Sequence, residues 1–454
     1  LLLKDDVANL QYGAIQAFVY AFTFIGGIFA DKILGFRKSL FWGGLLMIVG
    51  SLILATDPHK FFFLGIAFTV VGTGFFKPNI SSMVGQLYQD GDPRRDAGFS
   101  FFYMGVNLGA LIGGYVCIAV AEGSMWQSLI PEHLRWNVGF GFAALVMIIS
   151  LLTFTQTQKT LSTIGLSPLH EMVPSRRKIL EISTYLGSLL IIPVIIIMVA
   201  NTMYTDYFMM FIGPASILYL LYEMKNFSSA ENKKLLAALV FIIFSIFFWA
   251  FFEQSGGSLS LFAANNLNNT IAGVELSPNG VNNSANSLFV IGFAALVGLV
   301  WLWMAKKKIE PNTIIKFGLA FLFLAGGFWV FYYTQFFADL NGKTSLGIFT
   351  LGWLVITFGE LCLSPIGMSA MTKLSPQKTQ AVMMGMWFLA SAYGQYFAGI
   401  LGANIAEASE KASNLEKLIL YADGYKQLGI YAFILGGVLI VISPLVKKLM
   451  QEVK

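Results

Sequence analysis

The chain has 454 residues, of which 56% are hydrophobic and 12% charged, and its mean hydropathy is +0.71. Soluble domains carry roughly 25% charged residues, so this composition excludes a soluble protein and indicates an integral membrane protein. The net charge of +5 does not indicate nucleic-acid binding, because the basic residues lie in short clusters between apolar runs.

Thirteen apolar stretches are long enough to cross the hydrocarbon core, which takes roughly 20 helical residues. In chain order they are 10–30, 39–56, 61–87, 97–120, 136–155, 179–200, 207–222, 235–263, 287–305, 313–335, 345–372, 379–405 and 427–446. They predict an N-terminal bundle over 1–156, a linker with two inserted helices over 157–230, and a C-terminal bundle over 231–454.

The connections between the stretches alternate in charge. Twenty Lys and Arg residues fall in one alternate set, including Arg176–Lys178 and Lys306–Lys308, and seven fall in the other. The basic set is expected to face the cytoplasm, which places the C-terminus inside and Leu1 outside. An odd number of spans does not suit two similar halves, so we expect one helix before Leu1, in 30 to 50 further residues. The result is an all-α major facilitator fold of fourteen spans, with two six-helix bundles and an inserted hairpin.

Three ionisable residues fall deep inside predicted spans, where a charge is costly unless it is paired or wet. Lys77, in GTGFFKPNISS, lies about 24 Å below the outer start of its helix at 1.5 Å per residue. Glu360, in GELCLSPIGMS, lies at similar depth in the other half. The two side chains could pair when a central cavity closes, and a substrate or a proton could compete for either partner. The alternative is a static structural ion pair.

Glu253, in FFEQSGGSLS, lies nearer the outer face than Lys77 by about 10 Å. This position suits proton entry or an outer gate. The alternative is a carboxylate that only holds a kink, since the Ser and Gly residues that follow it predict a bend in the helix.

Several polar and aromatic residues of the spans could line a cavity or simply pack in the core. They are Tyr20, Tyr103, Asn107, Trp387, Tyr393 and Gln395. The three histidines have no metal-ligand spacing, and the two cysteines, Cys117 and Cys362, form no CxxC pair. No nucleophile with a base is recognisable, so we expect neither an enzyme nor a metal or other cofactor.

Five motifs in order resemble the proton-dependent oligopeptide transporters of the major facilitator superfamily, over essentially the whole chain. GGIFADKILGFRKS (26–39) is similar to the loop between the family's second and third helices, and GTGFFKPNISS (72–82) to its fourth helix. FFYMGVNLGALIGG (101–114) resembles the fifth-helix signature FYxxINxG, with Val106 in place of Ile. FFEQSGGSLS and GELCLSPIGMS resemble the seventh and tenth helices, and a matching Trp387 follows.

The resemblance implies symport of di- and tripeptides with protons by a monomer in the plasma (inner) membrane. Lys77 and Glu360 would bind the peptide termini, with Glu360 at the amino end, and would also take part in coupling. Asn107 and Tyr20 would hold the peptide's polar groups, and Tyr103 would also line the substrate site. Trp387 would shape a side-chain pocket, and Ser364 would lie one turn beyond Glu360. Glu253, Asp31 and Arg37 would serve proton coupling and gating.

One feature departs from the family. Its first helix carries an ExxER motif that assists coupling, and this motif occurs nowhere in the chain. We expect it in the missing helix before Leu1. Two alternatives stay open, namely a major facilitator carrier of another zwitterionic, anionic or drug-like solute and a membrane receptor or enzyme.

Overall fold

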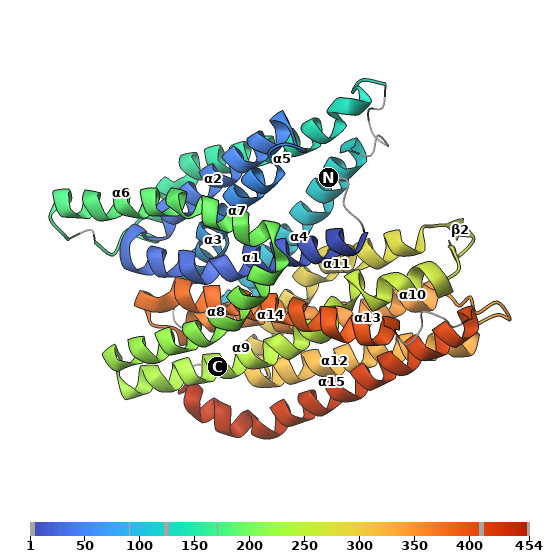
Figure 1. Ribbon diagram of the computed structural model, residues 1–454. Coiled ribbons are helices and arrows are strands. Elements are labelled where there is room, and N and C mark those ends of the chain that lie inside the picture. Colours follow the sequence, from blue (N-terminus) through green and yellow to red (C-terminus); the bar gives the residue numbers. More distant parts are fainter. Residues whose placement is uncertain are drawn as a thin grey trace. The chain divides into compact units, whose positions relative to one another are not determined.

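A computed structural model describes residues 5–89, 91–121, 126, 128–169, 171–407 and 413–451, and helices make up most of this part of the chain (Figure 1). The helices are α1 (Asp5–Phe29), α2 (Phe36–Thr56), α3 (Phe62–Gln86), α4 (Arg94–Ala121), α5 (Arg135–Thr157), α6 (Pro174–Leu190), α7 (Ile192–Ala200), α8 (Thr202–Glu223), α9 (Ser229–Phe252), α10 (Ser258–Asn266), α11 (Pro278–Lys306), α12 (Thr313–Tyr333), α13 (Leu346–Leu374), α14 (Gln380–Glu407) and α15 (Asn414–Met450). Two short strands, β1 (Thr270–Ile271) and β2 (Val274–Glu275), pair antiparallel as a hairpin.

Within the described residues, eleven helical segments are long and apolar enough to cross a membrane. They account for eleven of the thirteen predicted spans. The remaining two, 97–120 and 379–405, form the helices α4 and α14, of 28 residues each, and are confirmed as helices only. The span predicted at 235–263 is broken into α9 and α10 by a 3-10 turn at Glu253–Gly256, which confirms the predicted bend.

The chain divides into two compact units, which do not follow the sequence continuously. Unit 1 comprises residues 1–90, 112–235 and 371–392, and unit 2 comprises 91–111, 236–370 and 393–454. This grouping by proximity does not test the predicted boundaries near 156 and 230, which stay predictions.

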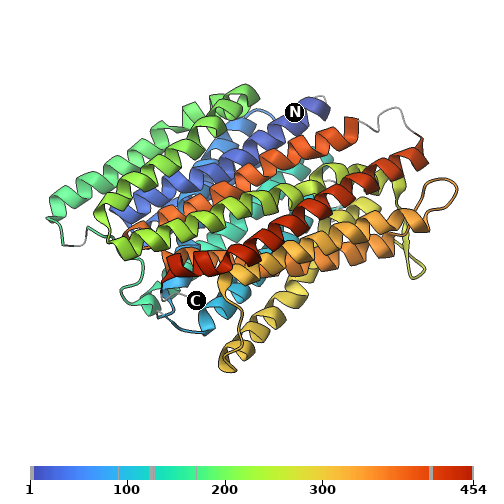
Figure 2. The same ribbon diagram turned by 90° about the horizontal axis from the view of Figure 1, so that it is seen from below.

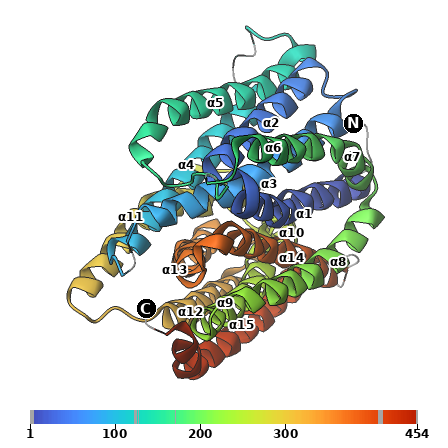
Figure 3. The same ribbon diagram turned by 90° about the vertical axis from the view of Figure 1, so that its left-hand side faces the viewer.

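In unit 1, α3 packs between α1 and α2, as Figures 1 and 3 show. The helices α7 and α8 also contact α1. The packing is made by apolar side chains that leave water together. The buried members of this cluster include Phe18, Phe22, Val70, Val71 and Phe75.

Glycines bring α1 into backbone contact with its neighbours in unit 1. A side chain at Gly26 would collide with the carbonyl of Gly74 on α3. A side chain at Gly385 on α14 would lie 2.6 Å from the α-carbon of Phe24. No residue larger than glycine fits these positions unless the helices move apart, a packing mode typical of membrane helices.

Ion pairs fasten the inserted helices to the basic ends of α1 and α2 in unit 1. Lys32 Nζ lies 2.9 Å from Glu223 at the end of α8, and Lys38 Nζ lies 2.6 Å from Glu181 on α6. Because the lysines are more than a third exposed, each pair contributes little to stability. The two pairs fix where the insertion meets the bundle.

In unit 2, α12 and α15 lie side by side over most of their length, which Figure 2 shows as neighbouring orange and red helices. Their interface is rich in aromatic rings. The rings of Phe331 and Tyr425 lie 5.8 Å apart, and those of Phe328 and Tyr425 lie 6.1 Å apart. This core positions α13, which carries Glu360.

Candidate substrate site and gating residues

Lys77 lies half-buried on α3 in unit 1, where two aromatic rings face its ammonium. Its Nζ is 3.6 Å from the ring centroid of Tyr20 on α1 and 4.8 Å from that of Phe388 on α14. The negative face of an aromatic ring attracts a cation, and the attraction grows where water is excluded. The structure therefore brings together Lys77 and Tyr20, two of the predicted site residues, and adds Phe388.

Glu360 is buried on α13 in unit 2, and its carboxyl group is held from two helices. The hydroxyl of Tyr103 on α4 donates a hydrogen bond to Oε1. The Nδ2 of Asn286 on α11 donates to Oε2 at 2.6 Å and also to Thr357 Oγ1 at 3.2 Å. A buried carboxyl group without such partners would be costly. The two donors therefore orient it as an acceptor for a further hydrogen-bonding or cationic group.

Asn107 lies one turn after Tyr103 on α4, and its Nδ2 donates to the Tyr103 carbonyl at 3.1 Å. The amide oxygen of Asn107 is the atom that could accept a hydrogen bond from a ligand. Ser364, one turn after Glu360, is buried, and its Oγ has no hydrogen-bond partner among the described residues. Tyr103, Asn107, Glu360 and Ser364 thus offer polar atoms on two helices of unit 2.

Trp387 is buried on α14 in unit 1. It directly precedes Phe388, which faces the Lys77 ammonium. Its role as the wall of a side-chain pocket stays a prediction.

Glu253 is the half-buried first residue of the 3-10 turn that separates α9 from α10. The neighbouring Gln254 holds this turn, since its Nε2 donates to the carbonyls of Ala250 and Ala398 at 3.1 and 3.2 Å. Ser258 Oγ completes the set by donating to Gln254 Oε1 at 3.0 Å. These bonds show that Gln254 helps to hold the bend. Proton coupling by Glu253, and the alternative that it also holds the kink, stay predictions.

Asp31 and Arg37, the predicted gating residues, make contacts at the loop between α1 and α2 in unit 1. The Asp31 carboxylate accepts hydrogen bonds from the N–H groups of Ala381 and Val382, at 3.1 and 2.8 Å. These groups lie in the first turn of α14, where a helix favours an anion. Arg37 donates through Nε to the Ile164 carbonyl at 2.6 Å. Neither contact includes Lys77 or Glu360.

Asn286 is not among the predicted site residues, because the predicted span began at 287 and left this residue in an Asn-rich loop. The structure begins α11 at Pro278, and the Ser277 side chain caps the helix by accepting from the Gly280 N–H. Serine followed by proline is a typical helix start. This signal would have placed Asn286 two turns inside the helix.

We expect Asn286→Ala to weaken substrate binding about tenfold, because it leaves a buried carboxyl oxygen without its donor at a cost of about 1–3 kcal/mol. Binding to the purified protein, measured by calorimetry, checks this. Asn283→Ala is the matched control, since exposed Asn283 donates within its own helix, to the Asn279 carbonyl at 2.9 Å. Equal affinities of the two variants would contradict the role of Asn286.

Comparison with known proteins agrees with this architecture. A family model described as PTR2, POT family, matches residues 37–418. The chain belongs to the POT family. This result confirms the family proposed from the five motifs, and the major facilitator fold is confirmed with it.

Relatives of the POT family match almost the whole chain. The peptide transporter YePEPT of Yersinia enterocolitica is 32% identical over 99% of this chain and 88% of its own length. A di-/tripeptide transporter of Lactococcus lactis is 31% identical over 98% of this chain and 86% of its own length. A crystal structure of peptide transporter POT in complex with sulfate is 30% identical, with a TM-score of 0.69, and covers 99% of this chain and 88% of that one. This chain is therefore a multi-pass membrane transporter of that family.

Proposed function

We propose that this POT-family chain imports di- and tripeptides together with protons by alternating access, as a monomer in the plasma membrane with its C-terminus in the cytoplasm. The observation that carries the proposal is the Glu360 carboxyl group, buried on α13 and held by Tyr103 and Asn286. A hydrogen-bonded carboxylate inside a membrane protein suits an ammonium ligand. The relatives that carry peptides agree with this assignment.

A peptide is a zwitterion, so its site needs opposite charges at its two ends. Glu360 supplies the negative charge for the amino end, and Lys77 supplies the positive charge for the carboxylate end. Tyr20 and Phe388 place their rings against the Lys77 ammonium, and an ammonium attracts a carboxylate through a charge-assisted hydrogen bond. Asn107 and Tyr103 serve the peptide's polar groups, and Trp387 its side chains.

Uptake into liposomes tests this function. We expect the purified protein to accumulate labelled dialanine when the proton gradient is directed inward, and unlabelled tripeptides to compete. The gradient is then collapsed with a protonophore as a control. Absence of gradient-driven uptake, or lack of competition by tripeptides, would contradict the proposal.

The alternative is a carrier of another zwitterionic, anionic or drug-like solute. One POT-family structure, 26% identical with a TM-score of 0.70 over 96% of this chain and 88% of that one, holds 5-aminolevulinic acid, a small molecule with an amine and a carboxylate. The same liposomes separate the two functions. Inhibition of dialanine uptake by 5-aminolevulinic acid but not by tripeptides would favour the alternative.

A further inference from the structure

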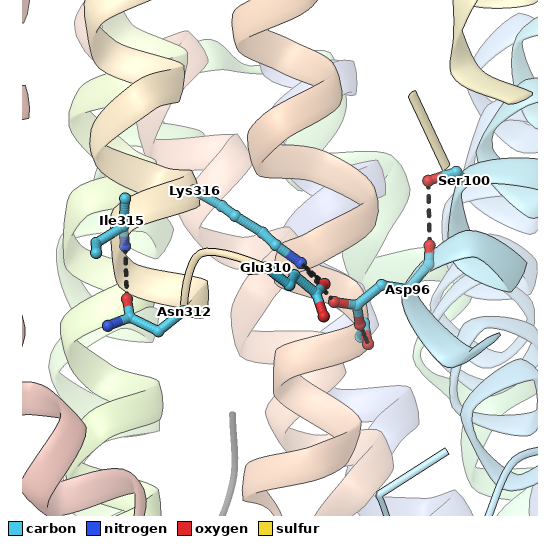
Figure 4. Close-up of polar contacts among 7 residues, drawn as sticks. Asp96, Ser100, Glu310, Asn312, Ile315 and Lys316 are labelled. Carbon is cyan, nitrogen blue, oxygen red and sulfur yellow. Dashed lines mark hydrogen bonds and ion pairs between the residues drawn. The ribbon is translucent and has the colours of Figure 1, made fainter. Parts of the chain in front are cut away.

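Three charged side chains, Asp96, Glu310 and Lys316, meet in a largely buried cluster in unit 2 (Figure 4). Lys316, in the first turn of α12, places its Nζ 3.0 Å from Asp96 Oδ2 and 2.5 Å from Glu310 Oε1. The side chains of Lys316 and Asp96 are 2% and 7% exposed, and that of Glu310 is 26% exposed. Lys316 therefore pairs with two carboxylates, of which that of Asp96 is buried and that of Glu310 is partly exposed to solvent.

Further contacts draw other helices of unit 2 into this cluster. Ser369 on α13 donates its hydroxyl to Asp96 Oδ1 at 2.5 Å. The Lys316 ammonium also lies 4.8 Å from the ring of Trp301 on α11. Asp96 itself is in the first turn of α4. The cluster thus ties the beginning of α4 to α11, α12 and α13.

The two carboxylates differ in how they are linked to Lys316. Glu310 precedes it by six residues, in the connection that leads into α12, so it stays near Lys316 if α12 moves. Asp96 is 220 residues away and arrives on α4. By sequence, α4 belongs to the predicted N-terminal bundle and α11 to α13 belong to the C-terminal one. Only the Asp96 contact must therefore break if the two predicted bundles separate at this end.

The same two helices carry the Glu360 site. Asp96 precedes Tyr103 by seven residues on α4, and Ser369 follows Glu360 by nine on α13. At 1.5 Å per residue the cluster lies about 10–14 Å along these helices from the Tyr103–Glu360 contact, toward their basic end. A passage that opens between α4 and α13 on that side must break the Tyr103–Glu360 contact and the contacts of Asp96 in the cluster.

We propose that Asp96, Lys316 and Glu310 form a latch that closes the basic, cytoplasmic end of the transporter and must release α4 before substrate leaves on that side. The inference rests on the proposed function for the identity of the substrate but not for the motion. A buried charge that loses its partner is strongly destabilised. Glu310 keeps Lys316 paired while the latch is open, so it lowers the cost of opening.

This division of roles predicts opposite effects for two variants that each remove one negative charge. Asp96→Asn weakens the closed state, because Lys316 keeps Glu310 and loses only its long-range ion pair. Glu310→Gln weakens the open state, because Lys316 then has no carboxylate after Asp96 departs. A cluster that only stabilises the fold would shift both variants in the same direction.

The latch is tested by the reactivity of a cysteine at position 100. Ser100 is fully buried on α4, one turn after Asp96, and its hydroxyl donates to the Asp96 carbonyl at 3.1 Å. Ser100→Cys is made in a protein with Cys117→Ser and Cys362→Ala, and a membrane-impermeant maleimide is applied to the cytoplasmic face without peptide. We expect Asp96→Asn to raise the labelling rate and Glu310→Gln to lower it, each about tenfold.

Asp92→Asn is the control, because the Asp92 carboxylate pairs with exposed Arg94 near the start of α4, at 2.8 Å, and lies outside the Lys316 cluster. Its labelling rate should be unchanged. Shifts of the two latch variants in the same direction, or rates that match this control, would overturn the proposal. If Asp96→Asn does not fold, judged by size-exclusion chromatography, an unchanged rate in Glu310→Gln overturns it alone. Glu310→Gln should also lower the maximal rate of counterflow and leave its KM unchanged.

Labelling without peptide separates this result from the transport assay. Opposite shifts in the labelling rate, together with no uptake of any peptide, would support the latch and remove the proposed substrate. Uptake of peptides together with unchanged labelling rates would support the proposed substrate and overturn the latch.

Discussion

Lys77→Ala is expected to lose both peptide binding and proton-driven uptake. The variant removes the ammonium that lies against the rings of Tyr20 and Phe388, and a charge-assisted bond to a carboxylate is worth about 1.5–3 kcal/mol. Affinity should fall about ten- to hundredfold. Binding and liposome uptake, measured on the same preparation, check this.

Lys60→Ala is the matched control for Lys77→Ala. Lys60 is an exposed lysine beside one aromatic ring, with Nζ 5.2 Å from the Phe61 centroid. Its removal should leave uptake unchanged. Full uptake by Lys77→Ala would show that Lys77 is structural and would remove the positive end of the proposed site.

Glu253→Gln is expected to abolish accumulation against a gradient and to leave peptide counterflow intact. The substitution keeps the size of the side chain and removes the group that can gain or lose a proton. Gln254 and Ser258 hold the adjacent bend, so the turn itself should persist. The measurement compares gradient-driven uptake with exchange at equal proton concentration on both sides.

Glu275→Gln, on the exposed strand β2, provides the control for the loss of one carboxylate. It should change neither assay. Loss of both uptake and counterflow in Glu253→Gln would refute its assignment to the proton. If Glu253→Gln retains both gradient-driven uptake and counterflow, Glu253 has no role in proton coupling or gating.

Much of the fold could be predicted because the lipid bilayer restricts which backbone structures can cross it. A span in lipid must satisfy its own backbone hydrogen bonds, so long apolar stretches become helices with few exceptions. The Gly and Ser residues after Glu253 also indicated the break between α9 and α10. The start of α11 was wrong because asparagines suggested a loop, while the Ser277 cap and Pro278 begin the helix inside that polar stretch.

The candidate site was found through charges that are costly in the middle of a span. Lys77 and Glu360 are such charges, and the structure gives each of them defined partners. Lys316 and Asp96 were not predicted as buried charges, because they lie at the ends of their predicted spans, where basic and acidic residues usually mark the membrane surface. Burial of Lys316 depends on contacts 220 residues away, which no local pattern reveals.

The pairing of Lys77 with Glu360 remains a prediction from their depths. Asn286 could not be predicted from the sequence for a different reason. Its importance comes from a hydrogen bond to Glu360 across 74 residues of sequence, and the same residue type occurs at many positions in this stretch. Sequence alone could not choose among these asparagines.

The glycine contacts of α1 have a mechanical consequence. Where Gly26 meets Gly74 and Gly385 meets Phe24, the facing backbones lie so close that a side chain on the glycine would collide with the neighbouring helix. Interdigitated side chains resist sliding because each must change rotamer to pass the next. A glycine has no side chain to interdigitate in this way. α14 belongs by sequence to the predicted C-terminal bundle and α1 to the N-terminal one, so at the Gly385 contact these two predicted bundles can shift with no rotamer change at this residue.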